Sequence, residues 1–388
     1  MRKCGIICEY DPFHNGHKYH LEKIKQATGA DIVCVMSGDF TQRALPALFD
    51  KWLRSEAALK CGADVVIELP VVYSTAPAEV FAFGAIKILS QIEGLKYFSC
   101  GVETDDTDAL KKIANLQSDE PPKMREYLRA LLKQGLSYPN CLAEATAAFL
   151  SDLSDKNSAF KYDKEYILGI LSSPNNVLAI EYLKAVARLR LDVEPIFIRR
   201  TDAGYKSKEL IPPYASATAI RVILQSDADY SAFVPFDYGK PKLDVGLYES
   251  VLRLSLLQKH ILFAEGMEKK LKKAAEKYAD LSQIIEAVKS KRYTYSRINR
   301  LIFSTMLDID GKFLKYSGDF LFRVLGIRPS FKSNLSDLGK NAVIKLTDKP
   351  YINQTGEDIF IIDKKASDLY AVITHSSSTR FCNRLRII

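Results

Sequence analysis

The feature that most constrains the fold is a repeated alternation of short apolar runs with amphipathic, helix-like stretches. The runs lie at residues 3–8, 31–37, 64–69, 95–100 and 194–199. Strands that are buried on both faces read as continuous apolar segments, and helices between such strands imply parallel neighbours. The sequence therefore predicts an α/β fold with a Rossmann-like parallel sheet.

The loops that follow three of these runs are predicted to share one site. They cover residues 9–16, 37–46 and 101–104. In open parallel sheets a ligand lies beyond the carboxyl ends of the strands. We therefore expect these three segments to converge on one ligand.

Three regions are expected along the 388 residues. Residues 1–230 form the Rossmann-like domain, which also includes one helical stretch at 121–150. Residues 231–308 change to long charged helices and are expected to form a helical domain. Residues 309–388 are expected to form a small α/β region, with a strand at the run AVITH, residues 371–375.

Composition and residue spacing favour a cytoplasmic protein with no membrane association. No apolar stretch approaches the roughly 20 residues that cross a bilayer. Glu9 and Asp11 interrupt the opening apolar run before a signal peptide can form. The seven cysteines form no CxxC pair, which suits a reducing compartment.

The five histidines lack zinc-site spacing, so no metal site built from protein side chains is expected. Any metal is expected to arrive with a nucleotide.

The motif Pro12-Phe13-His14-Asn15-Gly16-His17 carries the main chemical signal, because it lies between a buried strand and a helix. Residues three apart are neighbours on a helix, so His14 and His17 can point the same way beside the helix N-terminus. Free N–H groups and a partial positive charge make that terminus attractive to phosphate. The motif predicts nucleotidyl transfer, with both imidazoles donating to charge that develops on an α-phosphate. The structural alternative is that the two histidines only cap a loop.

Further polar residues follow predicted strands or open predicted helices. Each has a functional interpretation and a structural alternative. Ser216, Thr218 and Arg221 are expected to bind phosphate, and the alternative is that they only cap their helix. Gly101 is expected to leave room for a nucleotide, and the alternative is a plain turn. Asn175-Asn176 either contact a nucleotide or cap their helix. Arg199-Arg200 either contact a nucleotide or are surface charges.

The net charge of +8 is compatible with a polyanionic partner, and a basic stripe in the expected helical domain indicates where one would bind. Tyr293 and Tyr295 interrupt this stripe, and aromatic side chains among cations suit stacking on nucleic acid bases. A solvated helix face is the alternative. The stripe consists of Lys269, Lys270, Lys272, Lys273, Lys277, Lys289, Lys291, Arg292, Arg297 and Arg300.

Six blocks in order give the chain a family likeness. They are EYDPFHNGHKYHL at 9–21, MSGDFTQR at 36–43, SPNNVLAIEYLKA at 173–185, RRTDAGY at 199–205, ASATAIR at 215–221 and KRYTYSRINRLIF at 291–303. Together they resemble the tRNA(Met) cytidine acetate ligase family of HxGH nucleotidyltransferase-like enzymes. The resemblance implies activation of acetate with ATP, with Mg²⁺ bound to the ATP, and acetylation of N4 of the wobble cytidine of elongator tRNA(Met).

The resemblance also implies which residues form each site. His14 and His17 would be catalytic, and Lys291, Arg292, Arg297 and Arg300 would bind tRNA. The ATP site would consist of Ile7, Cys8, Glu9, Tyr10, Asp11, Pro12, Phe13, His14, Asn15, Gly16, His17, Lys18, Tyr19, His20, Gly101, Asn175, Arg200, Ser216, Thr218 and Arg221.

Four residues depart from the family pattern. Asp11 and Asp39 stand where asparagine is more usual, and Lys206-Ser207 replace a His-Asp pair. A carboxylate near a triphosphate is repulsive unless a cation intervenes, so Asp11 is expected to weaken ATP binding or to increase its dependence on Mg²⁺. The sequence leaves two rival functions open. One is an adenylyltransferase that acts on a small metabolite with the same HxGH chemistry, and the other is an RNA-binding relative that has lost catalysis.

Overall fold

The computed structural model describes residues 1–156, 162–200, 212–225, 229–261, 266–345, 350–377 and 385–388. Residues 202–207, which include the Lys206-Ser207 departure, therefore lie outside the described residues. The strands are β1 (Lys3–Cys8), β2 (Asp31–Ser37), β3 (Val65–Leu69), β4 (Leu95–Val102), β5 (Glu194–Arg199), β6 (Phe322–Ile327), β7 (Ala342–Val343) and β8 (Arg386–Ile387).

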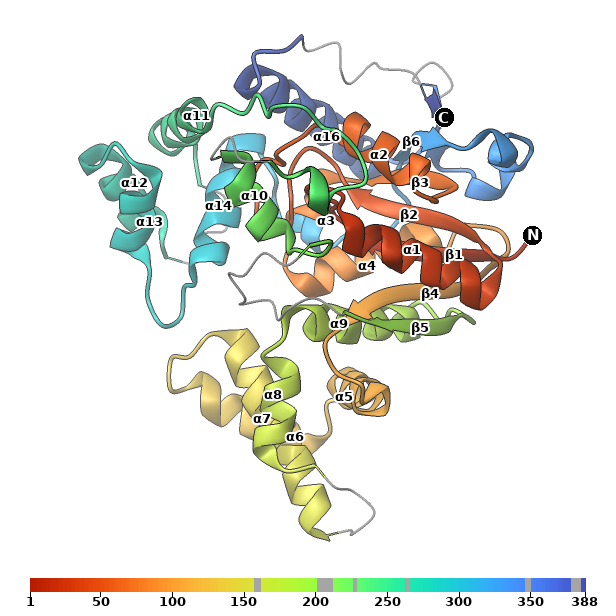
Figure 1. Cartoon of the computed structure of the whole chain (residues 1–388). Helices are drawn as coiled ribbons and strands as arrows, with labels where there is room; N and C mark the ends of the chain where they lie inside the picture. The colour runs from red at the N-terminus through yellow and green to blue at the C-terminus, as the bar shows by residue number, and fades with distance from the viewer. Residues whose placement is uncertain (157–161, 201–211, 226–228, 262–265, 346–349, 378–384) are drawn as a thin grey trace.

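The central sheet confirms the predicted Rossmann-like arrangement (Figure 1). Its order is β5-β4-β1-β2-β3-β6-β7, with β8 beside β6. The strands from β5 to β3 are mutually parallel. The order reverses at β1, because β2 and β3 extend to one side of it while β4 and β5 extend to the other. A ligand is expected at such a switch point, so the loops after β1 and β4 mark the site.

Helices cover both faces of the sheet. They are α1 (Asn15–Thr28), α2 (Lys51–Lys60), α3 (Val71–Ser74), α4 (Ala78–Leu89), α5 (Thr107–Asp119), α6 (Pro122–Leu132), α7 (Tyr138–Lys156), α8 (Lys164–Leu171), α9 (Pro174–Arg188), α10 (Ala217–Gln225), α11 (Val245–Gln258), α12 (Glu268–Lys277), α13 (Leu281–Val288), α14 (Tyr295–Leu307), α15 (Gly311–Leu314) and α16 (Gln354–Ile373), with 3-10 turns η1 (Ser231–Phe233) and η2 (Pro329–Leu338).

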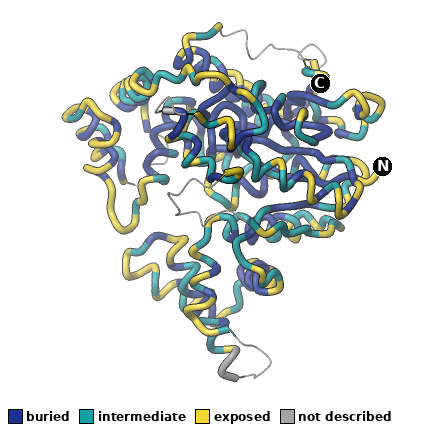
Figure 2. The backbone as a smooth tube through the Cα atoms, in the orientation of Figure 1, coloured by how far each residue is buried: buried dark blue, intermediate teal, exposed yellow. Residues whose placement is uncertain are grey.

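Alternate residues of β2 show how the two faces are buried. Ile32 and Cys34 pack in one core with residues of α1, α2 and α10. Val33 and Val35 pack in the other core with residues of α4 and α9. Successive side chains on a strand point to opposite faces, so both faces need apolar residues. Figure 2 shows the resulting buried sheet and the exposed outer surfaces of the peripheral helices.

The predicted single helical stretch at 121–150 is divided into α6 and α7. Gly135 lies between them with φ of 76°, a left-handed conformation that glycine adopts without a steric penalty. Helices α6 to α8 project below the sheet in Figure 1, whereas α5 packs mainly against α9. Helix α9 starts with Pro174 at its first turn.

The C-terminal residues complete the central sheet. Strand β6 pairs antiparallel with β3, and Val65 lies opposite Ile327. The expected strand at 371–375 is wrong, because residues up to Ile373 belong to α16. Ala371 and Ile373 of that run continue the buried stripe of the helix, which includes Ile359 and Leu369. The division of the chain into three domains stays a prediction.

A buried ion network fastens α16 to the N-terminal part of the sheet. The Nζ of Lys51 lies 2.6 Å from Glu68 Oε1 and 3.4 Å from Asp39 Oδ2, and it donates to Ser367 Oγ at 2.8 Å. Asp39, which departs from the family pattern, therefore has a buried cationic partner within the protein. Asp363 accepts a hydrogen bond from the Val71 N–H, and burial together with Glu68 raises its pKa.

The described part of the chain contains neither a membrane-spanning helix nor a cluster of metal-binding side chains. No described helix combines the length and apolar character needed to span a bilayer. No group of three or more described His, Cys, Asp or Glu side chains is arranged to hold a metal ion.

Candidate active site

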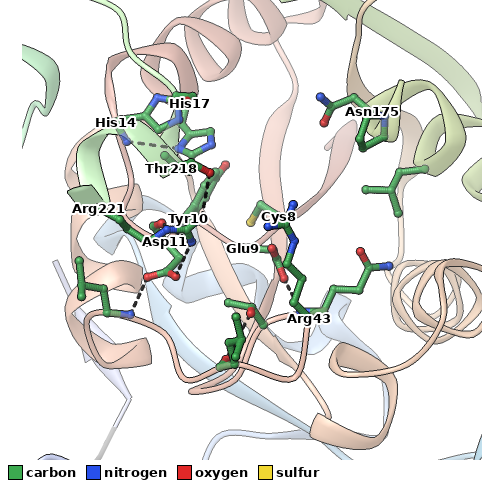
Figure 3. Close-up of a pocket in the computed structure, with 18 of the residues that line it drawn as sticks. Cys8, Glu9, Tyr10, Asp11, His14, His17, Arg43, Asn175, Thr218 and Arg221 are labelled. Carbon is green, nitrogen blue, oxygen red and sulfur yellow. Dashed lines mark hydrogen bonds and ion pairs between the residues drawn. The ribbon is translucent and has the colours of Figure 1, made fainter. Parts of the chain in front are cut away.

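A cavity of about 560 Å³ lies at the switch point of the sheet (Figure 3). The three predicted loop segments converge there, since Glu9, Gln42 and Gly101 all line it. Of the predicted ATP-site residues, those that line the cavity are Ile7, Cys8, Glu9, Tyr10, Asp11, His14, Gly16, His17, Tyr19, His20, Gly101, Asn175, Arg200, Ser216, Thr218 and Arg221. The structure thus brings together residues from five distant segments of the chain.

His14 and His17 open helix α1 and stabilise its first turn reciprocally. The Gly16 N–H donates to His14 Nδ1 at 3.1 Å, and the His14 N–H donates to His17 Nδ1 at 3.2 Å. The two rings stack with centroids 3.6 Å apart. Because each Nδ1 accepts a hydrogen bond, the proton of each neutral ring must lie on Nε2. Both histidines therefore keep an Nε2–H donor for another group.

Burial keeps these imidazoles uncharged. It lowers the pKa of His14 to about 3, with a further contribution from the Arg200 guanidinium. It also lowers the pKa of His17 well below the ordinary value, assisted by His14, Arg200 and His20. The buried Nε2 of His14 has no hydrogen bond to a described residue. A buried donor without a partner is costly, so this atom is suited to receive a ligand acceptor.

Asp11 is neutralised within the protein rather than left facing the cavity as a bare charge. Its Oδ1 accepts from the Leu48 N–H at 2.7 Å, and its Oδ2 lies 3.0 Å from a guanidinium nitrogen of Arg221. Arg221 also donates to Thr218 Oγ1 at 3.1 Å. The local repulsion expected from Asp11 is therefore offset, and Arg221 reaches the cavity with part of its charge already engaged.

Four predicted ATP-site residues do not line the cavity: Pro12, Phe13, Asn15 and Lys18. Asn15 Nδ2 donates to the carbonyl oxygens of Pro213 at 2.9 Å and of Ala232 at 3.0 Å, so its amide fastens α1 to a distant segment. Phe13 is buried in the core, and Lys18 lies on the surface near Glu22.

The pairs that the sequence left open are partly separated by the structure. Asn175 lines the cavity and its Nδ2 donates to Glu103 Oε1 at 2.6 Å. Asn176 is buried and accepts from the Glu103 N–H at 2.8 Å, which fixes the loop after β4. Arg199 and Arg200 both line the cavity.

Gly101 makes room for an arginine side chain. A Cβ added at Gly101 would lie 3.3 Å from Cγ of Arg200. The Arg200 N–H donates to the Val102 carbonyl at 2.9 Å, which continues the pairing of β5 with β4. The glycine therefore lets the guanidinium arm cross the edge of the sheet toward the cavity.

Some cavity residues were missed by sequence reasoning. Gln42 and Arg43 come from the loop after β2, and the predicted position of that loop was the available signal. Glu9 Oε1 accepts from the Gln42 N–H at 2.6 Å, and burial raises the Glu9 pKa. Glu249 and Asn299 come from the helical region. Glu249 lies in none of the six family blocks, whereas Asn299 lies in the block at 291–303, which was the available signal.

The predicted tRNA-binding residues lie on or next to α14. Lys291 and Arg292 are exposed before its first turn, whereas Arg297 and Arg300 are partly buried in it. Burial and the charge of Arg297 lower the pKa of Arg300. Tyr295, on the same helix, lines the cavity. The basic segment is thus continuous with the cavity wall.

Comparisons with known proteins agree with this geometry. The model of the HIGH Nucleotidyl Transferase family matches residues 1–384. A tRNA(Met) cytidine acetate ligase of Clostridium perfringens is 36% identical, over 97% of this chain and 96% of the relative. One of Thermoanaerobacter pseudethanolicus is 37% identical over 96% of each chain.

Two solved structures are similar to this chain over its whole length. The apo crystal structure of Thermotoga maritima TmcAL is similar, with a TM-score of 0.87, 28% identity and 100% of both chains covered. A second structure of that protein, bound with alpha-thio ATP, has a TM-score of 0.85 at the same identity and coverage. The chain belongs to the HIGH nucleotidyltransferases and, within them, to the tRNA(Met) cytidine acetate ligase family.

Proposed function

We propose that the protein joins acetate to N4 of the wobble cytidine of elongator tRNA(Met) through an acetyl-adenylate formed from ATP. The observation that carries this proposal is the pair of neutral imidazoles, His14 and His17, that retain Nε2–H donors at the N-terminus of α1. Such a site is built to accept a polyanion without first losing a proton or a competing salt bridge.

In the first half-reaction an acetate oxygen attacks the α-phosphorus of ATP. A new oxygen–phosphorus bond forms, the bond to the β-phosphate oxygen breaks, and pyrophosphate leaves. His14, His17 and the free N–H groups of α1 stabilise the negative charge that builds on the phosphoryl oxygens. No nucleophile from the protein is required, so the residues act by position and charge.

The nucleoside end of ATP is expected to lie between β4, β5 and α9. Gly101, Asn175 and Arg200 line that part of the cavity wall. Asn175 offers an amide, and Arg200 a cation that already shares the cavity with the histidines. The alpha-thio ATP bound by the similar Thermotoga maritima protein supports ATP as the nucleotide.

Mg²⁺ is expected to enter with the triphosphate. No described trio of metal-binding side chains is available, whereas phosphate oxygens are ligands that Mg²⁺ prefers. Bound in that way, the ion would neutralise charge on the leaving pyrophosphate.

In the second half-reaction the cytidine amine attacks the acetyl carbonyl. A carbon–nitrogen bond forms, the bond from the acetyl carbon to the AMP oxygen breaks, and N4 loses one proton. The target base must leave its stack to enter the cavity. Lys291, Arg292, Arg297 and Arg300 are suited to hold anticodon phosphates at the adjoining surface.

The test is nucleoside mass spectrometry on unmodified elongator tRNA(Met) incubated with the protein, ATP, Mg²⁺ and isotopically labelled acetate. Labelled N4-acetylcytidine that disappears without ATP is the expected result. If ATP yields AMP and pyrophosphate without that product, the acid or the acceptor is wrong, as for a small-metabolite adenylyltransferase. If nothing turns over, an RNA-binding relative without catalysis is favoured.

A further inference from the structure

Part of the cavity wall is not used by the proposed ATP site. It comes from the helical region rather than from the sheet, through the segment that leads into α11 and through α11, α13 and α14 (Figure 1). The lining residues there include Leu243, Val245, Glu249, Leu281, Tyr295 and Asn299. The mixture of apolar walls with two isolated polar groups is typical of a small-molecule pocket.

Asn299 is the first of the two polar groups. Its residue is only 3% exposed, and it lines the cavity. A side-chain amide offers two N–H donors and a carbonyl acceptor. At the cavity wall, this amide is therefore placed to pair with a ligand inside the cavity.

Glu249 is the second polar group. It lies on α11, is half-buried, and has no ion pair or hydrogen bond to a described residue. A glutamate carboxylate offers only acceptors, so it suits a ligand that presents N–H groups. Tyr295 lies four residues before Asn299 on α14, and side chains at this spacing share one face of a helix.

We propose that this compartment holds the acceptor cytosine. Glu249 accepts a hydrogen bond from the exocyclic N4 amine, Asn299 donates to N3 or O2 of the same edge, and Tyr295 stacks on the ring. The inference rests on the proposed function, because it names the residues that recognise the base in that reaction. Uracil would present a carbonyl oxygen to the Glu249 carboxylate, so the compartment also discriminates against uracil.

The test measures the binding of two tRNAs that differ only at the wobble base. One carries cytidine, and the other carries the 2-pyrimidinone nucleoside, which lacks the exocyclic amine. The wild-type protein is expected to bind the second tRNA at least tenfold more weakly, as for one lost hydrogen bond to a charged group. Glu249→Ala is expected to bind both equally, and Glu249→Gln to recover part of the difference.

A matched control keeps net charge from explaining the result. Glu276 on α12 is exposed and does not line the cavity, so Glu276→Gln is expected to retain the full wild-type preference for cytidine. Asn299→Ala is expected to raise KM for tRNA about tenfold or more. Thermal unfolding of each variant checks that the fold is intact.

The outcome also separates this inference from the function on which it rests. If wild-type protein makes N4-acetylcytidine but Glu249→Ala keeps the wild-type preference, the compartment is wrong and the function stands. If wild-type protein forms neither acetyl-adenylate nor N4-acetylcytidine, the proposed function fails and the inference fails with it. Equal binding of both tRNAs by the wild type would likewise overturn the assignment of Glu249.

Discussion

Replacing His17 separates the two tasks that the structure gives this residue. Its Nδ1 accepts the His14 N–H at 3.2 Å, while its Nε2–H remains for the phosphoryl group. Asparagine places an acceptor at the position of Nδ1 and has nothing at the position of Nε2. His17→Asn should therefore retain the turn and lose the donor, whereas His17→Ala should lose both.

The expected magnitudes follow from this geometry. Loss of one preorganised donor costs about 2.7–4 kcal/mol of transition-state stabilisation, or roughly 100 to 1000-fold in rate. Both His17 variants should show that loss in acetate-dependent exchange of pyrophosphate into ATP. Loss of the hydrogen bond from the His14 N–H should lower the free energy of unfolding by about 1 kcal/mol in His17→Ala alone, measured with urea.

Two results would contradict a role of His17 Nε2 at the reacting phosphate. Exchange at the wild-type rate in His17→Asn would mean that Nε2 does not contact the reacting phosphate. A large loss of rate in His17→Ala that His17→Asn fully restores would mean that His17 acts only by holding the helix start. The corresponding variants His14→Asn and His14→Ala would then have to be compared in the same way.

Three more expectations test the surroundings of the site. Gly101→Val should displace Arg200, whose Cγ lies 3.3 Å from the new Cβ, and should raise KM for ATP about tenfold with kcat retained, as steady-state kinetics would show. Lys51→Met should lower the free energy of unfolding by about 3–5 kcal/mol in urea titrations, because it leaves the buried Glu68 carboxylate without its cation. Burial lowers the pKa of His20 to about 4, so the unfolded chain, with an ordinary pKa of about 6.5, binds more protons between those values. Stability should therefore fall as pH drops from about 6.5 to 4, and His20→Gln should flatten that slope; an unchanged slope would contradict the assignment.

The sheet was predictable because its strands are buried on both faces. Continuous apolar runs such as 31–37 leave little choice except a parallel strand covered by helices, and the structure confirms them. The position of His14 and His17 after β1 followed from the same pattern. Local sequence therefore determines both the first strand-to-helix junction and the chemistry that it carries.

Contacts between distant segments were not predictable in the same way. The run at 371–375 has the β-branched composition of a strand, but tertiary packing makes it the end of α16. Asp11 looked like an unfavourable charge because Arg221, its partner, lies 210 residues away in the chain. Glu249 and Asn299 belong to different helices, and only the fold brings them to one cavity.

The antiparallel pairing of β6 with β3 has a consequence for protein synthesis. Val65 pairs with Ile327, which is synthesised roughly 260 residues later, so that edge of the sheet stays uncovered until then. At about 5–20 residues per second, the nascent chain exposes the β3 edge for on the order of 13–50 seconds. An uncovered edge strand pairs readily with other chains. Ribosomes that stall before residue 322 should therefore release fragments that depend on chaperones, even though every residue of the histidine motif has already been made.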